Sequence, residues 1–150
     1  MLDRHQTRKL AFQALFMLAS NPDLSIPRAL QIVLAIQENH QDDDQTPVVL
    51  DKSDPNQVYL ETLVTEVSAK QTELDQALTP KLKKGWTLAR LSRTDLILLR
   101  IGLDEIQNQP TIPNAVAINE AIQLAKEFSD ANAEKFINGV LASFLPAATK

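Results

Sequence analysis

Apolar residues recur at spacings of three and four positions along most of the chain, and the alternation of apolar and polar residues typical of strands is absent. This pattern predicts an all-α protein. Prolines that follow capping residues or occupy first turns indicate where helices start. The expected helices cover residues 3–19, 27–39, 55–78, 92–109, 114–128 and 131–145, with one or two short helices around Gly85 and Trp86 in residues 79–91.

The helix expected over residues 92–109 differs from the others because apolar residues occupy most of its circumference. Such a helix has neighbours on several sides, so we expect it at the centre of the fold. Ser92, with Asp95 three residues later, indicates its N-cap. Its polar stripe includes Arg100 and Asp104, whose four-residue spacing allows them to pair. Trp86, the single tryptophan, is expected to anchor the core rather than to stack on a base.

The composition predicts one helical domain spanning residues 1–150. With 44% hydrophobic residues, the chain can bury a core without disulfides or a structural metal, and it contains no cysteine. It has no apolar stretch long enough to cross a membrane and no secretory leader at its start. We therefore expect a cytoplasmic protein that has no membrane partner.

Charge is distributed unevenly along the chain. The net charge is −4, but residues 38–54 alone carry −5, so the remainder carries +1. We interpret residues 40–54 as an acidic loop within the domain. Residues 81–100, in contrast, contain six basic residues against a single acid. Basic surface patches are therefore compatible with the acidic composition.

The residue patterns of catalytic and metal sites are absent. The sequence has no HExxH motif, no phosphate-binding glycine loop and no dinucleotide fingerprint. The run Asp42–Asp44 does not begin a calcium loop, because Pro47 would stand where that loop needs a glycine. We expect no catalytic residue, no metal and no cofactor, and therefore a protein that is not an enzyme.

Basic and aromatic side chains form a strip along the first expected helix. His5, Lys9, Phe12 and Phe16 recur at i, i+4, i+7 and i+11, and two arginines flank the first turns. Cationic groups attract phosphates and aromatic faces stack on unpaired bases, so the strip predicts binding of single-stranded RNA. The candidate RNA-binding residues of this helix are Arg4, His5, Arg8, Lys9, Phe12 and Phe16. The alternative is that both phenylalanines belong to the core and the basic residues are a solvated helix start.

The last expected helix has an unusual polar face. Large apolar residues occupy one arc, whereas the opposite arc carries small residues and only one charge, Lys135. A face meant for water usually carries several charges, and a mid-helix glycine such as Gly139 costs about 1 kcal/mol relative to alanine. We therefore expect a docking surface that includes Asn138 and Ala142. Phe136 lies at its border, either half-buried or turned toward RNA.

Four segments carry a specific combination of motifs: residues 4–16, 99–106, 112–121 and 135–141, the last two containing the runs VAINEA and KFINGVL. Together they resemble the bacterial transcription antitermination factor NusB family over nearly the whole chain. The resemblance implies an all-helical fold of about seven helices in two packed subdomains, without catalytic activity. It also implies binding to the boxA element of nascent ribosomal RNA together with NusE, a small-subunit ribosomal protein, in the transcription elongation complex.

The same resemblance assigns roles to individual residues. Arg4, Arg8, Lys9 and Phe16 would form the RNA-facing edge, which Phe136 joins. The partner-binding candidates are Glu120, Lys126, Lys135, Asn138, Gly139 and Ala142. Two alternatives remain. One is a helical interaction module that forms a homodimer or binds another partner and has no role with RNA. The other is the RNA-guiding module of an RNA methyltransferase, although 150 residues leave no room for a methyl-donor domain.

Overall fold

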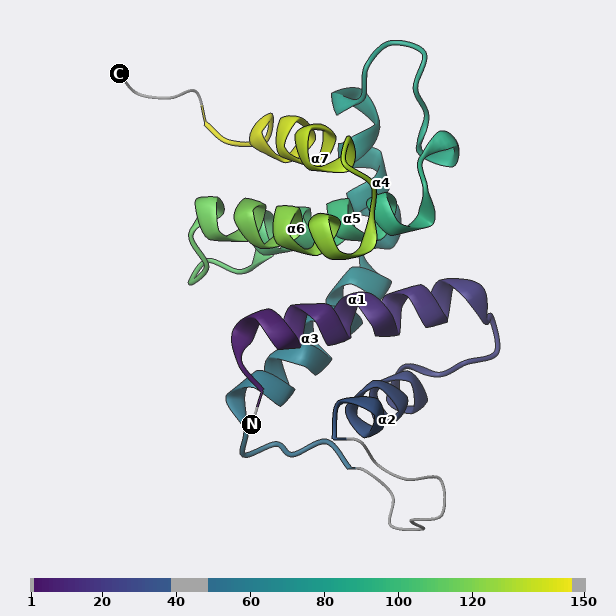
Figure 1. Ribbon diagram of the computed structural model, residues 1–150, viewed down its shortest axis with the longest axis vertical. Helices are drawn as coiled ribbons and strands as arrows, with labels where there is room; N and C mark the ends of the chain where they lie inside the picture. Colours follow the sequence, from purple (N-terminus) through teal and green to yellow (C-terminus); the bar gives the residue numbers. More distant parts are fainter. Residues whose placement is uncertain (1, 39–48, 147–150) are drawn as a thin grey trace. The chain divides into compact units, whose positions relative to one another are not determined.

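The computed structural model describes residues 2–38 and 49–146, and it is built from helices and turns (Figure 1). These described residues contain seven α-helices, two 3₁₀ helices and no strand, which confirms the all-α prediction. The chain divides into two compact units, residues 1–68 and residues 69–150. Most of the expected acidic loop lies outside the described residues. No helix among the described residues is long and apolar enough to span a membrane.

The first unit contains α1 (Arg4–Ser20), α2 (Ile26–Gln37) and all but the last residue of α3 (Pro55–Ala69). Asp3 begins α1 with a reciprocal capping box, in which its carboxylate accepts from the Gln6 N–H at 2.7 Å and the Gln6 side chain accepts from the Asp3 N–H at 3.0 Å. Ser25 caps α2 with a single bond, in which its hydroxyl oxygen accepts from the backbone N–H of Arg28 at 3.2 Å. The apolar faces predicted by the three- and four-residue spacing are buried, with Leu10, Leu30, Val33, Leu60 and Leu63 at their centres.

The approach to α3 is fixed by local hydrogen bonds and by one bond to the start of the chain. The Asp51 carboxylate accepts from the backbone N–H and the hydroxyl of Ser53, at 2.9 and 2.6 Å, and these two bonds lower the pKa of the Asp51 carboxyl. The Asn56 amide donates to the backbone oxygen of Leu2 at 2.7 Å. This bond joins the start of α3 to the start of the chain.

The prediction of a single helix over residues 55–78 is wrong. The structure has two helices there, α3 and α4 (Gln71–Leu78), separated at Lys70, whose φ of −101° and ψ of 12° depart from helical values. Neither proline nor glycine marks the break. Apolar residues continue at helical spacing on both sides of it, as Val67 and Leu74 show, and both are buried. Periodicity therefore could not reveal that the helix ends at Ala69 and a new one starts at Gln71.

The second unit contains α4, the 3₁₀ helices η1 (Thr79–Lys81) and η2 (Leu88–Arg90), α5 (Arg93–Asn108), α6 (Asn114–Phe128) and α7 (Ala133–Ala142). Helix α5 contacts α4, α6 and α7, which confirms its predicted central position (Figure 1). Gly102 allows α7 to approach α5 closely, because a Cβ atom at this glycine would lie 2.6 Å from Cδ1 of Leu141. Ser92 caps α5 as predicted and accepts from the Asp95 N–H.

Two details of the second unit correct the sequence predictions. Arg100 pairs with Asp75 of α4 rather than with Asp104, through two hydrogen bonds of 2.8 Å from its Nε and Nη2 atoms. Helix α7 begins later than expected, because the Asp130 carboxylate accepts from the backbone N–H groups of Asn132 and Ala133, at 3.0 and 3.1 Å. Residues 130–132 therefore form a side-chain-closed turn before the helix.

Candidate nucleic-acid interface

The accessible part of the α1 strip centres on Phe16 and Arg4. Phe16 is 37% exposed, and its ring centroid lies 6.0 Å from that of Phe12, which is only 4% exposed. The guanidinium carbon of Arg4 lies 4.2 Å from the centroid of the Tyr59 ring, so a cation–π contact orients this exposed side chain. One aromatic face and one oriented cation of the strip are therefore available at the surface.

The other residues of the strip differ in accessibility. His5 and Lys9 are half-buried, whereas Arg8 is 2% exposed. Phe12 and Arg8 thus lie in the interior and not on the surface that the strip predicts. The burial of Phe12 agrees with the alternative that it is a core residue. The exposure of Phe16 does not agree with that alternative. Contact of these residues with RNA stays a prediction, and Arg4, His5, Lys9 and Phe16 are the ones within reach of solvent.

Helix α7 presents the two faces that its sequence predicts. Ala133, Ile137, Val140 and Leu141 are buried. The opposite face is exposed along its length, and its residues are Lys135, Asn138, Gly139, Ala142 and Ser143. A Cβ atom at Gly139 would meet no atom within 4 Å, so nothing in the described part of the chain covers this position. On α6, Glu120 is half-buried, and Lys126 is exposed and pairs with Glu134 of α7 at 3.7 Å.

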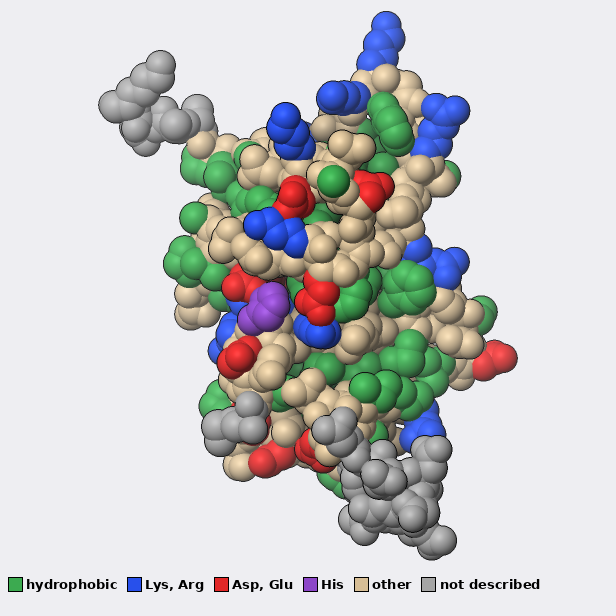
Figure 2. Space-filling model, in the orientation of Figure 1, with side chains coloured by type: hydrophobic (Ala, Val, Ile, Leu, Met, Phe, Trp, Pro, Cys, Tyr) green, Lys and Arg blue, Asp and Glu red, His purple; other side chains and the backbone are tan. Residues whose placement is uncertain are grey.

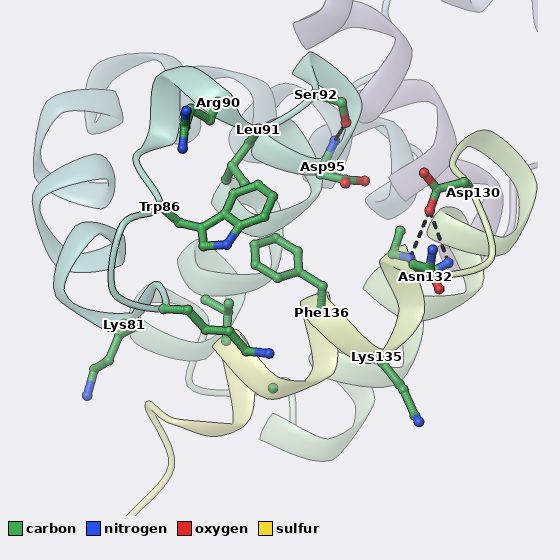
Figure 3. Close-up of a pocket in the computed structure, with 14 residues that line it drawn as sticks. Lys81, Trp86, Arg90, Leu91, Ser92, Asp95, Asp130, Asn132, Lys135 and Phe136 are labelled. Atoms are coloured by element: carbon green, nitrogen blue, oxygen red, sulfur yellow. Dashed lines mark hydrogen bonds between the residues drawn. The ribbon is translucent and has the colours of Figure 1, made fainter.

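A groove with a volume of about 770 Å³ lies between α7 and the segment of residues 79–92 (Figure 3). Trp86 from the segment and Phe136 from α7 point toward one another across it. We call it the Trp86 groove, and its aromatic and basic lining residues are Lys81, Lys83, Trp86, Arg90, Lys135 and Phe136. It unites Phe136, predicted to bind RNA, with Lys135 and Gly139, predicted to bind a partner.

Trp86 is a site residue that the sequence interpretation missed. It is 51% exposed, so the expectation that it anchors the core is wrong. A tight turn places it, because its backbone N–H donates to the Lys83 oxygen at 2.9 Å and Gly85 between them has a φ of +88°. These values fit a type II turn with glycine at its third position. The Lys-Gly pair before the tryptophan was the available signal, since a turn tip is seldom buried.

The electrostatics of the Trp86 groove favour an anion. Its lining contains four basic residues against two acids, Asp95 and Asp130. Both acids already accept hydrogen bonds, Asp95 from the Ser129 hydroxyl at 2.7 Å and Asp130 from the first turn of α7. Figure 2 shows Lys and Arg side chains gathered around hydrophobic ones over the segment that joins α4 to α5. A local excess of positive charge thus surrounds the aromatic residues.

These features define an all-helical binding protein with exposed aromatic and basic residues. The model of the NusB family matches residues 5–146, and the Transcription antitermination protein NusB of Lacticaseibacillus paracasei is 48% identical over 147 residues, covering 98% of this chain and 97% of that protein. The chain belongs to the NusB family. The family consists of transcription antitermination factors and is not enzymatic.

Solved structures agree with the fold. The structure of T. maritima NusB superimposes with a TM-score of 0.77 at 28% identity, covering 95% of this chain and 89% of that one. A chain from a structure of antitermination factors NusB and NusE in complex with dsRNA gives a TM-score of 0.73 at 21% identity, covering 93% of both chains. The second likeness shows the same fold.

Proposed function

We propose that this protein is an RNA-binding transcription antitermination factor of the cytoplasm. In this proposal it binds the boxA element of nascent ribosomal RNA as unpaired RNA, together with NusE, within the transcription elongation complex, and residues 1–150 act as one binding domain. Family membership supports this role. The observation that carries RNA binding is the exposed Phe16 ring on the same helix as the exposed, oriented Arg4 guanidinium.

The chemistry of this strip matches single-stranded RNA. Cationic side chains bind phosphates and provide most of the affinity, and an accessible aromatic face adds about 1–3 kcal/mol for each base that stacks on it. Arg4 and Lys9 would contact phosphates, and Phe16 would stack on a base. Arg8 and Phe12 would support these residues from the interior.

The exposed face of α7 and the polar face of α6 are the proposed NusE-binding surface. The first consists of small side chains that leave the helix backbone open to close approach, as Gly139 shows. Lys126 and Glu120 extend the surface with charged groups. Such a combination gives shape complementarity from the small residues and orientation from the charges.

The test measures binding of a labelled boxA RNA oligonucleotide to the full chain, with and without NusE. We expect NusE to tighten binding and added salt to weaken it, because phosphate contacts release counterions. Phe16→Ala should weaken binding about 5- to 150-fold. Arg28→Ala is the matched control for Arg4→Ala, because both arginines are exposed in the first unit and Arg28 lies on α2 outside the strip.

Three results would contradict the proposal: no effect of NusE, a flat salt titration, or equal affinities of wild type, Phe16→Ala and Arg4→Ala. The second candidate function is an interaction module without a role in RNA binding, and the uncovered face of α7 favours it. In that case the protein would form a homodimer through Asn138, Gly139 and Ala142 or bind a protein partner, and sedimentation would report the dimer while RNA binding stayed absent.

A further inference from the structure

We propose that the Trp86 groove binds one unpaired nucleotide of the RNA, with the base between Trp86 and Phe136 and the adjoining phosphates on Lys83 and Lys135. The inference rests on the proposed function and adds a second place of RNA contact, in the unit of residues 69–150. It also assigns Lys135 to RNA rather than to the protein partner.

The aromatic residues supply the surface that a base requires. Trp86 is about half exposed, Phe136 is half-buried, and the two side chains approach the groove from opposite walls (Figure 3). Leu91 and Val140 add apolar lining. A flat aromatic base can therefore contact π-faces and apolar atoms at once, and this contact does not depend on which base is bound.

The volume of the groove suits a ligand of this size. Pockets for small molecules and cofactors typically measure about 300–1,000 Å³, and a volume of about 770 Å³ falls in that range. The groove therefore has room for a nucleotide and for part of the chain on either side of it. Its open side allows the RNA backbone to enter and leave.

The basic side chains of the groove differ in how firmly they are held. The Lys81 ammonium donates to the Ser143 oxygen at 3.3 Å and lies 5.2 Å from the centroid of the Phe144 ring. Arg90 donates to the Gly85 oxygen at 3.3 Å, which steadies the turn before Trp86. Within residues 2–38 and 49–146, Lys83 and Lys135 are exposed and make no hydrogen bond or ion pair. These two lysines are the ones free to bind phosphate.

Charge decides between RNA and a protein segment as the occupant. The two acids of the groove are already hydrogen-bonded within the chain, so its lining offers a ligand an excess of cationic groups beside aromatic and apolar side chains. A repeating anion with flat bases complements both properties. A peptide would complement the cations only where its own acidic residues coincided with them.

The first measurement uses Trp86 as its own reporter, because it is the only tryptophan of the chain. Titration with single-stranded boxA RNA should quench its fluorescence to saturation, with the same Kd that the anisotropy of labelled RNA gives. A fully paired duplex of the same sequence should quench much less, because its bases cannot enter the groove. Equal quenching by the duplex would overturn the insertion of an unpaired base.

The second measurement compares variants by anisotropy. Trp86→Ala should weaken RNA binding about 5- to 150-fold, and Trp86→Phe should retain most of the affinity because it keeps an aromatic face. Lys83→Ala should weaken binding and lower the slope of log K against log salt by about 0.7, the value for one phosphate of a single strand. Lys84→Ala is the matched control, since Lys84 is the exposed neighbour that does not line the groove.

The outcomes separate this inference from the proposed function. If Trp86→Ala and Lys83→Ala bind RNA as wild type does while Phe16→Ala is impaired, the groove assignment is wrong and the α1 strip stands. If Trp86→Ala loses NusE binding and keeps its RNA affinity, the groove is a protein site and the inference is overturned. If the wild-type protein binds no boxA RNA with or without NusE, the proposed function itself fails.

Discussion

The two walls of the Trp86 groove are built in different ways. Helix α7 forms one wall and carries Phe136 on a regular helix whose opposite side is buried against α5 and α6. The other wall is the segment of residues 79–92, which has two short 3₁₀ helices, a glycine turn and no buried residue in its 3₁₀ helices. One wall is positioned by packing, the other by hydrogen bonds and backbone conformation. Mutations in α7 should therefore act through lost packing, and mutations in residues 79–92 through lost hydrogen bonds or backbone strain.

Substitutions in the core side of α7, the wall that is positioned by packing, should have the largest effect on stability. Leu141 of α7 is completely buried and lies against Gly102 of α5. We expect Leu141→Ala to lower the free energy of unfolding by about 2–5 kcal/mol, because it leaves a cavity in the core. Urea unfolding measures this change.

A double-mutant cycle with Gly102→Ala sharpens this test. In the wild-type background the new methyl group would meet Leu141 at 2.6 Å, so the leucine has to shift. In the Leu141→Ala background the methyl group fills part of the cavity. The two changes should therefore be less destabilising together than their sum. Additive changes would show that the packing of α7 on α5 does not depend on this contact.

The packed elements are the part of the molecule that the sequence predicts well. Helical periodicity identified the buried arcs of α5 and α7 and the exposed Asn138 and Gly139, because a regular helix converts spacing directly into direction. The same method merged α3 with α4, since the break at Lys70 leaves the apolar spacing unchanged. It also misplaced Trp86, because periodicity carries no information where the chain is irregular and long-range neighbours decide burial.

The ion pair between Asp75 and Arg100 connects the two helices that flank residues 79–92, the irregular wall of the groove, so removing it tests how the ends of this wall are held. It joins α4, which precedes residues 79–92, to α5, which follows them, and its side chains are only 25% and 11% exposed. Asp75→Asn should lower the free energy of unfolding by about 1–3 kcal/mol, because it weakens charge-assisted bonds to a partly buried guanidinium.

Glu73→Gln serves as the control for Asp75→Asn, because it removes an exposed carboxylate on the same helix. It should change stability by less than about 0.5 kcal/mol. A similar loss for both variants would mean that net charge, and not the ion pair, is responsible.

Two glycines, one on each wall, should show opposite changes in stability when they are replaced by alanine. Gly85 has a φ of +88°, which strains any residue with a Cβ atom, so Gly85→Ala should cost about 1 kcal/mol or slightly more. Gly139 lies in a helix with open space around its Cα, so Gly139→Ala should stabilise by up to about 1 kcal/mol. Thermal unfolding of both variants measures the two changes in stability. Gly85→Asn, which tolerates this conformation better, should cost less than Gly85→Ala. Changes of the same sign would contradict the distinction between the walls.

Trp86→Ala should show the smallest effect on stability, despite the size of the side chain removed. A buried aromatic residue replaced by alanine costs about 3–5 kcal/mol, because both transfer free energy and packing are lost. Trp86 is 51% exposed at a turn whose geometry depends on Gly85 and Lys83, so we expect a change below about 1 kcal/mol in urea unfolding followed by circular dichroism. A large loss of RNA affinity with this small loss of stability would identify Trp86 as a residue held at the surface for binding. A loss of several kcal/mol would instead assign it to the core, and the irregular wall would then be positioned by packing just as α7 is.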